Sequence, residues 1–307
     1  MDFPPVRASS LQDSRGRWPA PPTIAVLTPV YNEKGNLEPM IRSLARQTIR
    51  PERVLICDNG STDGGAELAK EALQRAGLRH EIIVLPRYPA MGKWNINNAY
   101  WSLAKALAKT GFRPDFVATI EADVTLEPLY FEKLVEYFSD DPLLGIAGGR
   151  LEPMGLLKGS FPLGKGGIMV WGGNRMYSFK CWLELTGVVD LRYLPTWDTD
   201  HAVLAAIRGY HVLASSVATS RASRAVSTSR GRPKAMADAA HGLPLWWAAF
   251  KALQYRDSSY LVEFCVRRLS SGGRHLYTSN ECLKSLGSVY NRAAFQVLRS
   301  TLRGIPT

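Results

Sequence analysis

Acidic side chains follow three short apolar runs of this 307-residue chain, at points where buried strands would end. Glu33 follows the first run, Asp58 the second, and the closely spaced pair Glu121 and Asp123 the third. Two carboxylates one residue apart at a strand end can share a divalent cation with a pyrophosphate, and such oxygen ligands suit Mg²⁺ or Mn²⁺. The pattern predicts a metal site of this kind, and the alternative is a pair of acids that merely caps a strand-to-loop junction.

The elements that would position these acids form a β-α-β unit at the start of the chain. The runs at 24–27 and 54–57 are short, rich in β-branched residues and bounded by turn formers, which predicts buried strands. Between them, residues 36–47 have apolar side chains at helical spacing, with Asn36 as the expected N-cap. In an open parallel sheet ligands bind beyond the carboxyl ends of the strands, so Tyr31, Glu33, Asp58 and Asp63 would line one cleft.

Strands and helices continue to alternate as far as residue 123, which favours a doubly wound, mostly parallel α/β sheet flanked by helices. We expect strands at 82–85, 115–120 and 144–147, and helices at 64–77, 93–109, 129–138, 176–185, 200–207 and 239–255. Residues 151–173 are rich in Gly and Pro and predict a long loop, of the kind that often binds an acceptor.

Two motifs at the first strand ends resemble those of glycosyltransferase family 2. They are Thr28-Pro-Val-Tyr-Asn-Glu33 and the Asp-x-Gly-Ser-Thr-Asp turn that begins at Asp58. The resemblance implies a GT-A fold and a nucleotide-sugar donor linked to UDP or GDP, whose base and ribose would contact Pro29, Tyr31, Glu33 and Asp58. Taken singly, an Asp-Asn-Gly turn or a loop glutamate is more often structural.

The resemblance also implies how the donor's diphosphate is held. Glu121-Ala-Asp123 matches the family's D-x-D motif, which gives Asp123 the metal and Glu121 a ribose or metal-bound water. Glu121 replaces the usual aspartate, so its carboxylate is displaced by one methylene. Lys93, in a segment similar to the family's Gly-Lys-x-x-A-L-N, would approach the pyrophosphate at a helix N-terminus. Its alternative is an ordinary solvent-facing lysine.

Inverting transfer needs a base that takes the proton of the attacking acceptor, and Asp or Glu usually serves. Trp197-Asp198-Thr-Asp200 is similar to the family's E-D-x-D segment, which assigns the base to Asp198 and leaves Trp197 where relatives carry Glu. The alternative is that Asp198 or, more readily, Asp200 only caps the following helix.

The remaining site residues also come from the resemblance. Gly172, Gly173 and Asn174, with Trp197, match the segment where family members place the acceptor and the donor sugar. Arg221 and Arg224 would grip the diphosphate, since guanidinium matches phosphate oxygens bidentately. The Q-x-x-R-W motif of processive synthases is absent from the sequence, which favours the addition of a single sugar.

The charge of the chain is concentrated near its C-terminus. Residues 221–307 hold 14 Lys and Arg against 4 Asp and Glu, a net +10 of the chain's +11. With Trp246, Trp247 and Phe250 on an expected helix, this block predicts contact with an anionic membrane surface, and hence a lipid-linked or envelope-glycan acceptor. Ordinary packing of the aromatic residues is the alternative. No nucleic-acid-reading module accompanies the basic residues.

The expected organisation has a disordered leader at 1–22, a GT-A domain at 23–234 and a basic helical extension at 235–307. Residues 23–123 would form the nucleotide-binding half of the domain and 124–234 the acceptor half. No run approaches the ~20 apolar residues of a spanning helix, which predicts a cytoplasmic protein, with peripheral contact at the inner face of the membrane. The four scattered cysteines predict reduced thiols.

The function expected from these patterns is an inverting, metal-dependent transfer of one sugar to a hydroxyl acceptor. Glu121 and Trp197, which depart from the family motifs, leave a second hypothesis open: a catalytically degenerate domain that binds nucleotide sugar or serves as a scaffold. An oxidoreductase is excluded because no G-x-G-x-x-G follows the first strand.

Overall fold

The computed structural model describes residues 21–86, 96–153, 170–188, 197–224, 239, 243–255 and 258–270. The strands are β1 (Ile24–Val30), β2 (Arg53–Asp58), β3 (His80–Val84), β4 (Phe116–Ile120), β5 (Val124–Leu126), β6 (Leu144–Glu152), β7 (Asn174–Ser178) and β8 (His211–Ala222). The helices are α1 (Lys34–Ala45), α2 (Gly65–Arg75), α3 (Ile96–Lys109), α4 (Tyr130–Asp140), α5 (Phe179–Val188), α6 (Trp197–Ile207), α8 (Leu245–Tyr255) and α9 (Ser258–Ser270). The expected leader up to residue 20, Lys93 and the chain after 270 lie outside the described residues.

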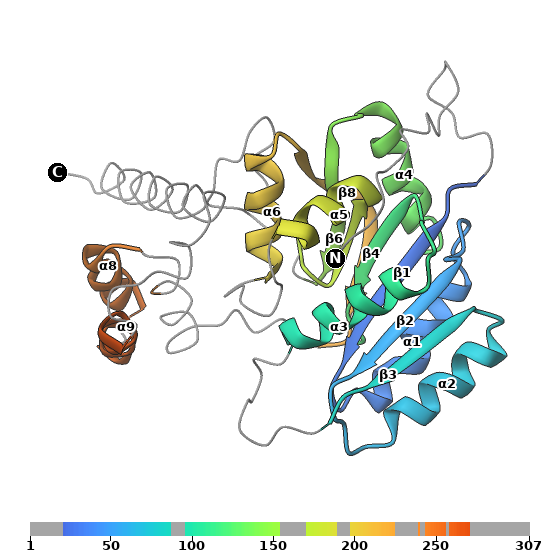
Figure 1. Ribbon diagram of the computed structural model, residues 1–307, viewed down its shortest axis with the longest axis horizontal. Coiled ribbons are helices and arrows are strands. Elements are labelled where there is room, and N and C mark those ends of the chain that lie inside the picture. The colour runs from blue at the N-terminus through green and yellow to red at the C-terminus, as the bar shows by residue number, and fades with distance from the viewer. Residues whose placement is uncertain are drawn as a thin grey trace.

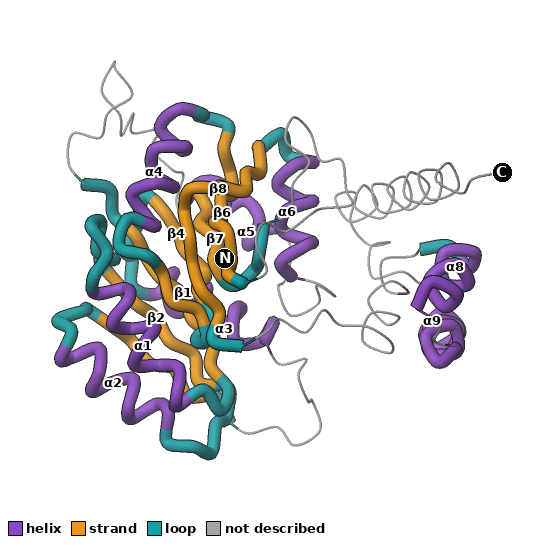
Figure 2. The backbone as a smooth tube through the Cα atoms, turned by 180° about the vertical axis from the view of Figure 1, so that it is seen from behind, coloured by secondary structure: helices purple, strands orange, loops and turns teal. Residues whose placement is uncertain are grey.

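The strands form one eight-stranded sheet in the order β3-β2-β1-β4-β7-β6-β8-β5. The pairs β2–β3, β1–β2, β1–β4 and β6–β8 are parallel, whereas β4–β7, β6–β7 and β5–β8 are antiparallel. Helices cover both faces of the sheet (Figures 1 and 2). The first half is therefore the doubly wound parallel sheet that the sequence predicts, and the antiparallel pairs enter with the second half.

Two apolar clusters, one on each face, explain why the central strands are continuously apolar. In β1, Val26 packs into the cluster that includes α1, α2 and α4. Its neighbours Ala25 and Leu27 pack into the cluster that includes α3, α5 and α6. Because both faces of the strand are buried, residues 24–27 form an unbroken apolar run instead of an alternation.

Several expected elements differ from the structure. Asn36 is not the N-cap of α1: the helix begins at Lys34, and the Asn36 amide donates to Glu33 Oε2 at 2.6 Å. Residues 174–178, expected as loop and helix, form β7, and β5 and β8 were not expected at all. Their pairing partners are distant in sequence, and such tertiary pairing overrides local pattern.

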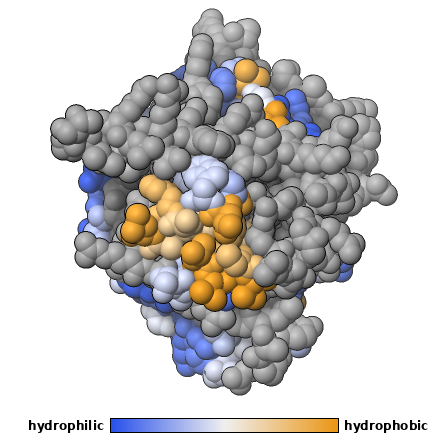
Figure 3. Space-filling model, turned by 90° about the vertical axis from the view of Figure 1, so that its left-hand side faces the viewer, coloured by the Kyte–Doolittle hydropathy of each residue, from blue (hydrophilic) through white to orange (hydrophobic). Residues whose placement is uncertain are grey.

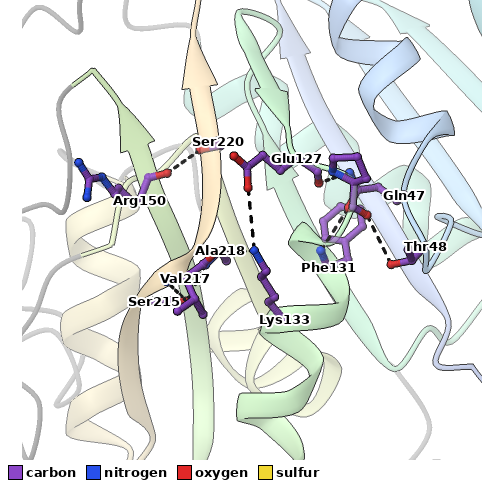
Figure 4. Close-up of polar contacts among 11 residues, drawn as sticks. Gln47, Thr48, Glu127, Phe131, Lys133, Arg150, Ser215, Val217, Ala218 and Ser220 are labelled. Atoms are coloured by element: carbon purple, nitrogen blue, oxygen red, sulfur yellow. Dashed lines mark hydrogen bonds and ion pairs between the residues drawn. The ribbon is translucent and has the colours of Figure 1, made fainter.

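A buried glutamine holds the segment after Asp123 against the first β-α-β unit. Gln47 follows α1 and donates from Nε2 to the Glu127 carbonyl at 2.8 Å, while its Oε1 accepts from the backbone N–H of Phe131 at 3.2 Å (Figure 4). Lys133 Nζ lies 3.9 Å from Glu127 Oε2 in the same turn. The segment that carries Asp123 is thereby fixed relative to the helix that starts beside Glu33.

The last described helices, α8 and α9, pack against each other at the side of the molecule remote from β3 (Figure 1). Trp247 is buried in the apolar cluster of that face, and Trp246 and Phe250 pack against it. Trp247 thus shows the ordinary packing of the alternative, whereas Trp246 and Phe250 are only partly buried, and contact of this block with a membrane stays a prediction. Within the described residues, no helix is long and apolar enough to cross a bilayer.

Candidate functional site

The loops after β1 and β2 are bound together by side chains of the two family motifs. Asn32 has a φ of 53°, a left-handed conformation that Asn adopts more readily than most residues. Its N–H donates to Ser61 Oγ, and its Oδ1 accepts from the N–H of Thr62, both at 2.9 Å. Asp63 Oδ2 accepts from the N–H of Lys34 at 2.9 Å. Asp63, which the sequence places in the cleft, thus holds the start of α1 in place.

The two loops present the residues expected to hold a nucleotide. Asp58 is buried at the end of β2, where its Oδ1 accepts from the N–H of Ser61 at 2.7 Å. Tyr31 is more than half exposed, so its ring is free to cover a ligand, and Pro29 is partly buried on β1. The structure brings these side chains to one edge of the sheet, because β1 and β2 are adjacent and parallel.

One arginine joins the acids from two elements. Arg224, just after β8, lies with its Nε 2.8 Å from Asp123 Oδ2 and pairs through Nη2 with Glu33 Oε1. The side chains of both acids are almost buried, whereas that of Arg224 is 62% exposed. Arg221 is exposed on β8 and makes no ion pair with a described residue. Of the two arginines that the sequence singles out, only Arg224 therefore contacts the acidic group.

Glu121 and Asp198 lie against two consecutive glycines. A Cβ built on Gly173 would lie 2.6 Å from Glu121 Cδ, and one built on Gly172 would lie 2.9 Å from Asp198 Cβ. The backbones of Glu121 and Gly173 are also hydrogen-bonded to each other: the Glu121 N–H donates to the Gly173 carbonyl at 3.0 Å. Glycine is needed at both positions because no larger residue allows this approach.

Burial and neighbouring acids raise the pKa of two carboxyl groups of the site. Burial, together with the charges of Asp123 and Asp198, raises the pKa of Glu121 to about 7. Burial also raises the pKa of Asp123, against the opposing effect of Arg224. Removal of carboxylates from water and their mutual repulsion both disfavour ionisation, so a cation bound here would be stabilising.

These residues fit a divalent metal of the Mg²⁺ or Mn²⁺ type. The donors are carboxylate oxygens, and in nucleotide sites Mg²⁺ usually takes one or two carboxylates and completes its shell with water and phosphate. Among the described residues, no three His, Cys, Asp or Glu side chains are grouped closely enough to hold a metal alone. Asp123 and Glu121 would therefore hold it only together with a nucleotide, and Asp123 would have to exchange its contact with Arg224.

Asp198 lies in the first turn of α6 and not before it. Its Oδ1 accepts from the N–H of Thr199 at 2.8 Å, while the side chain remains partly exposed. Asp200 lies in the same turn, fully buried. The expectation that Asp200 caps the helix is therefore wrong, since the residue belongs to the helix itself.

Two of the expected acceptor residues have structural partners. Asn174 is fully buried, and its Nδ2 donates to the Gly149 carbonyl at 3.0 Å and to Ser220 Oγ at 2.8 Å. Trp197 is nearly buried and stacks on Tyr100 with ring centroids 3.9 Å apart. Of the residues expected to bind the acceptor, Gly172 and Gly173 border the two acids.

Sequence reasoning missed Tyr100 and Arg175 as site residues. Tyr100 is fully buried on α3, and its hydroxyl has no hydrogen-bond partner among the described residues. Burial and the charge of Glu121 raise the Tyr100 pKa well above its usual value. Arg175 is buried on β7 and contacts the Asp198 carbonyl. Neither residue stands out in the sequence, because each lies inside an otherwise ordinary helix or strand.

The contact between Gly173 and Glu121 yields a test of the site. We expect Gly173→Ala to lower donor turnover by roughly 10- to 100-fold, because the added methyl must displace the Glu121 carboxylate. Gly187→Ala, in α5, is the control: its Cβ would meet nothing within 4 Å, so it should leave turnover unchanged. Steady-state kinetics with matched amounts of folded protein decides. Parent-like turnover in Gly173→Ala would mean that Glu121 has no fixed role.

Residues 25–158 match the family model described as glycosyl transferase family 2. Over 120 residues the chain is 35% identical to the undecaprenyl-phosphate 4-deoxy-4-formamido-L-arabinose transferase of Pectobacterium carotovorum. This alignment covers 37% of this chain and 33% of that protein. Over 121 residues the chain is 27% identical to glycosyltransferase GlyA of Streptococcus pneumoniae, in an alignment that covers 38% of this chain and 16% of that protein. The matches thus span a third or less of these curated relatives.

Among solved structures, the chain is similar to the mannosyltransferase PcManGT of Pyrobaculum calidifontis, determined with GDP-Man and Mn²⁺. The TM-score is 0.54 at 17% identity, over 93% of this chain and 81% of that one. A likeness at this identity concerns the fold, and it agrees with the sheet and the flanking helices described above. The chain therefore has the GT-A glycosyltransferase fold, and its residues 25–158 are similar to glycosyl transferase family 2.

Proposed function

We propose that this chain transfers a single sugar, with inversion, from a UDP- or GDP-linked donor to an acceptor, with the help of Mg²⁺ or Mn²⁺. The observation that carries the proposal is the contact of Gly172 with Asp198 and of its neighbour Gly173 with Glu121. It sets the expected base directly beside the expected diphosphate site. The match of residues 25–158 to the family 2 model supports the same chemistry, as does the PcManGT structure with GDP-Man and Mn²⁺.

The donor would lie over the loops after β1 and β2. Asp58 would accept a hydrogen bond from the base, Tyr31 would cover the nucleoside, and Asp123 with Glu121 would hold the metal. When bound, that metal supplies charge neutralisation at the departing diphosphate. Arg224 would turn from Asp123 toward the phosphate oxygens, which its guanidinium matches bidentately. Lys93 stays a candidate for the same phosphates.

Asp198 would act on the acceptor. A hydroxyl acceptor must lose its proton as it attacks the anomeric carbon, and a carboxylate within hydrogen-bond reach can take that proton. The bond from the acceptor oxygen to the anomeric carbon forms while the bond to the diphosphate breaks on the opposite face. Asp198 is partly exposed beside Gly172, so an acceptor can reach it.

Two kinds of acceptor follow from different observations. The presence of an accessible acid at the base position favours a hydroxyl, on a glycan or a lipid-linked sugar. The name of the Pectobacterium relative favours a polyprenyl phosphate. A phosphate is already largely ionised at neutral pH and needs no base. The response of turnover to Asp198→Asn therefore separates the two.

A donor screen tests the proposed function and its alternative. UDP- and GDP-sugars are added with Mn²⁺, binding is followed by thermal shift, and slow hydrolysis of the donor is measured without acceptor. A transferase should release nucleoside diphosphate from at least one donor, and Asp123→Asn should abolish that release. Donor binding without any release would instead favour a degenerate nucleotide-sugar-binding domain.

The membrane expectation now rests on aliphatic residues. Leu245, Leu253, Val262 and Val266 are all at least half exposed on α8 and α9. Figure 3 shows an apolar patch on the side of the molecule where these helices lie. Such a patch within a basic part of the chain suits an anionic bilayer surface. An acceptor carried by a membrane lipid would be reached there.

We expect liposome flotation to detect this contact. The double variant Leu253→Glu with Val262→Glu should lose most of its binding to vesicles rich in anionic lipid, because each buried aliphatic side chain contributes about 1.5–3 kcal/mol. Val84→Glu, at an exposed valine of β3, is the matched control and should float like the parent. Binding that ignores anionic lipid, or survives the double change, would contradict the membrane proposal.

A further inference from the structure

Arg175 is a fully buried guanidinium at the centre of the second half of the sheet. It forms no ion pair with any carboxylate of the described residues, although burial of an unpaired charge is costly. A methionine or leucine would fill a strand position of this kind at lower cost. The arginine must therefore be explained by the groups to which it donates.

Each nitrogen of the guanidinium donates to a different backbone carbonyl. Nε donates to Trp171 O at 3.2 Å, Nη2 to Val170 O at 2.5 Å and Nη1 to Asp198 O at 2.7 Å. The Tyr177 hydroxyl lies 3.3 Å from Nη1, which gives that nitrogen a second contact. The guanidinium group also lies over the ring of Trp197, with Cζ 5.5 Å from the ring centroid.

These carbonyls belong to two separate parts of the chain. Val170 and Trp171 lead directly into Gly172 and Gly173, and Asp198 lies in the first turn of α6. Arg175 thus links two parts of the chain through one rigid group: the glycine segment and the turn that carries the expected base. The planar guanidinium group can donate to all three carbonyls at once because it has three nitrogens, whereas a lysine has only one.

We infer that Arg175 is a positioning residue, which fixes the Asp198 carboxylate against the Gly172–Gly173 backbone in the geometry needed for transfer. The inference rests on the proposed function for its catalytic meaning. Arg175 need not contact any ligand, because it is sealed from solvent and each of its three nitrogens already donates to a backbone carbonyl. Its effect would pass through the placement of Asp198.

The kinetic test compares kcat in two variants of Arg175 with kcat in a variant of its neighbour Met176. Arg175→Lys keeps the charge but loses most of the directed hydrogen bonds, and Arg175→Met loses both. We expect kcat to fall by roughly 10- to 100-fold for Arg175→Lys and further for Arg175→Met, since a small misplacement of a catalytic group costs about this much. The Kd for UDP or GDP with Mn²⁺ should stay within about 2-fold of the parent, because the donor loops are untouched.

Met176→Ala is the control for simple destabilisation. Met176 is fully buried next in the strand, but its side chain packs into the opposite apolar cluster. This variant should lower Tm while kcat per folded molecule stays near that of the parent. If kcat in the two Arg175 variants fell only in step with Tm, as in Met176→Ala, Arg175 would be a structural residue and the inference would be wrong.

Hydrogen exchange gives a readout that needs no turnover. In Arg175→Lys the amides of residues 170–175 and 197–204 should exchange at least several-fold faster than in the parent, while those of α4 and β1 stay unchanged. In Met176→Ala this localised change should be absent. Unaltered exchange in both segments would contradict the inference that Arg175 holds them in place. A parent enzyme that binds nucleotide but never releases it from a donor would instead contradict the proposed function.

Discussion

Asp123→Asn should abolish the effect of metal on nucleotide binding. The parent is expected to bind UDP or GDP at least 10-fold more tightly with Mn²⁺ than without, since the metal bridges the diphosphate to this carboxylate. In the variant the two affinities should coincide, because a neutral amide is a poor substitute for an anionic ligand. Isothermal titration of the nucleoside diphosphate, with Mn²⁺ and with chelator, measures both affinities directly.

Two further variants make this result specific to the site. Glu127→Gln removes one charge from an exposed position four residues along the same segment, and it should leave the metal effect intact. Glu121→Asp should weaken the effect only mildly, as it keeps the charge. The fold of Asp123→Asn should persist, because Arg224, with which the carboxylate pairs, is itself largely exposed. Metal-free binding as tight as metal-loaded binding in the parent would exclude the metal-diphosphate site.

The first half of the fold could be predicted from the sequence because local pattern and tertiary position agree there. The runs that become β1, β2 and β4 are buried on both sides, so each is mostly apolar without alternation and has a polar turn at its carboxyl end. The acids at those ends then meet, since adjacent parallel strands end at one edge. Glu33 and Asp123, 90 residues apart, share Arg224 as a consequence.

The second half could not be predicted in the same way. β7 is five residues long and includes Asn174 and Arg175, two polar side chains that usually exclude a central strand. Both are tolerated because their nitrogens donate to internal partners, namely Gly149, Ser220 and three further backbone carbonyls. No local signal shows that such partners will be available. The same holds for Tyr100, which reaches the site only because α3 packs against β1 and β2.

The aromatic residues of α8 show the limit of reading a surface from composition. Trp246, Trp247 and Phe250 have the composition of a membrane anchor, yet the rings pack on one another and on the cluster of that face. The exposed apolar surface is instead formed by aliphatic residues such as Leu253 and Val262. Helical spacing could not decide between the two faces, because both are apolar.

Asp198→Asn is the second substitution expected to have a large effect. If Asp198 takes the proton of a hydroxyl acceptor, kcat should fall by roughly 10²–10⁴-fold while the Kd for donor nucleotide stays near that of the parent. The asparagine keeps the size of the side chain and an oxygen that can still accept from the Thr199 N–H. The loss would therefore report on proton transfer and not on a displaced helix.

Asp200→Asn, in the same helical turn, distinguishes the base from a structural acid. Asp200 is fully buried, so this variant should lower Tm while kcat per folded molecule remains close to that of the parent. Single-turnover measurements with a hydroxyl acceptor and with a polyprenyl phosphate complete the comparison. Loss with the hydroxyl alone would identify Asp198 as the base. Retention of full activity with both acceptors in Asp198→Asn, together with its loss in Asp200→Asn, would move that role to Asp200, which would then have to become exposed during the reaction.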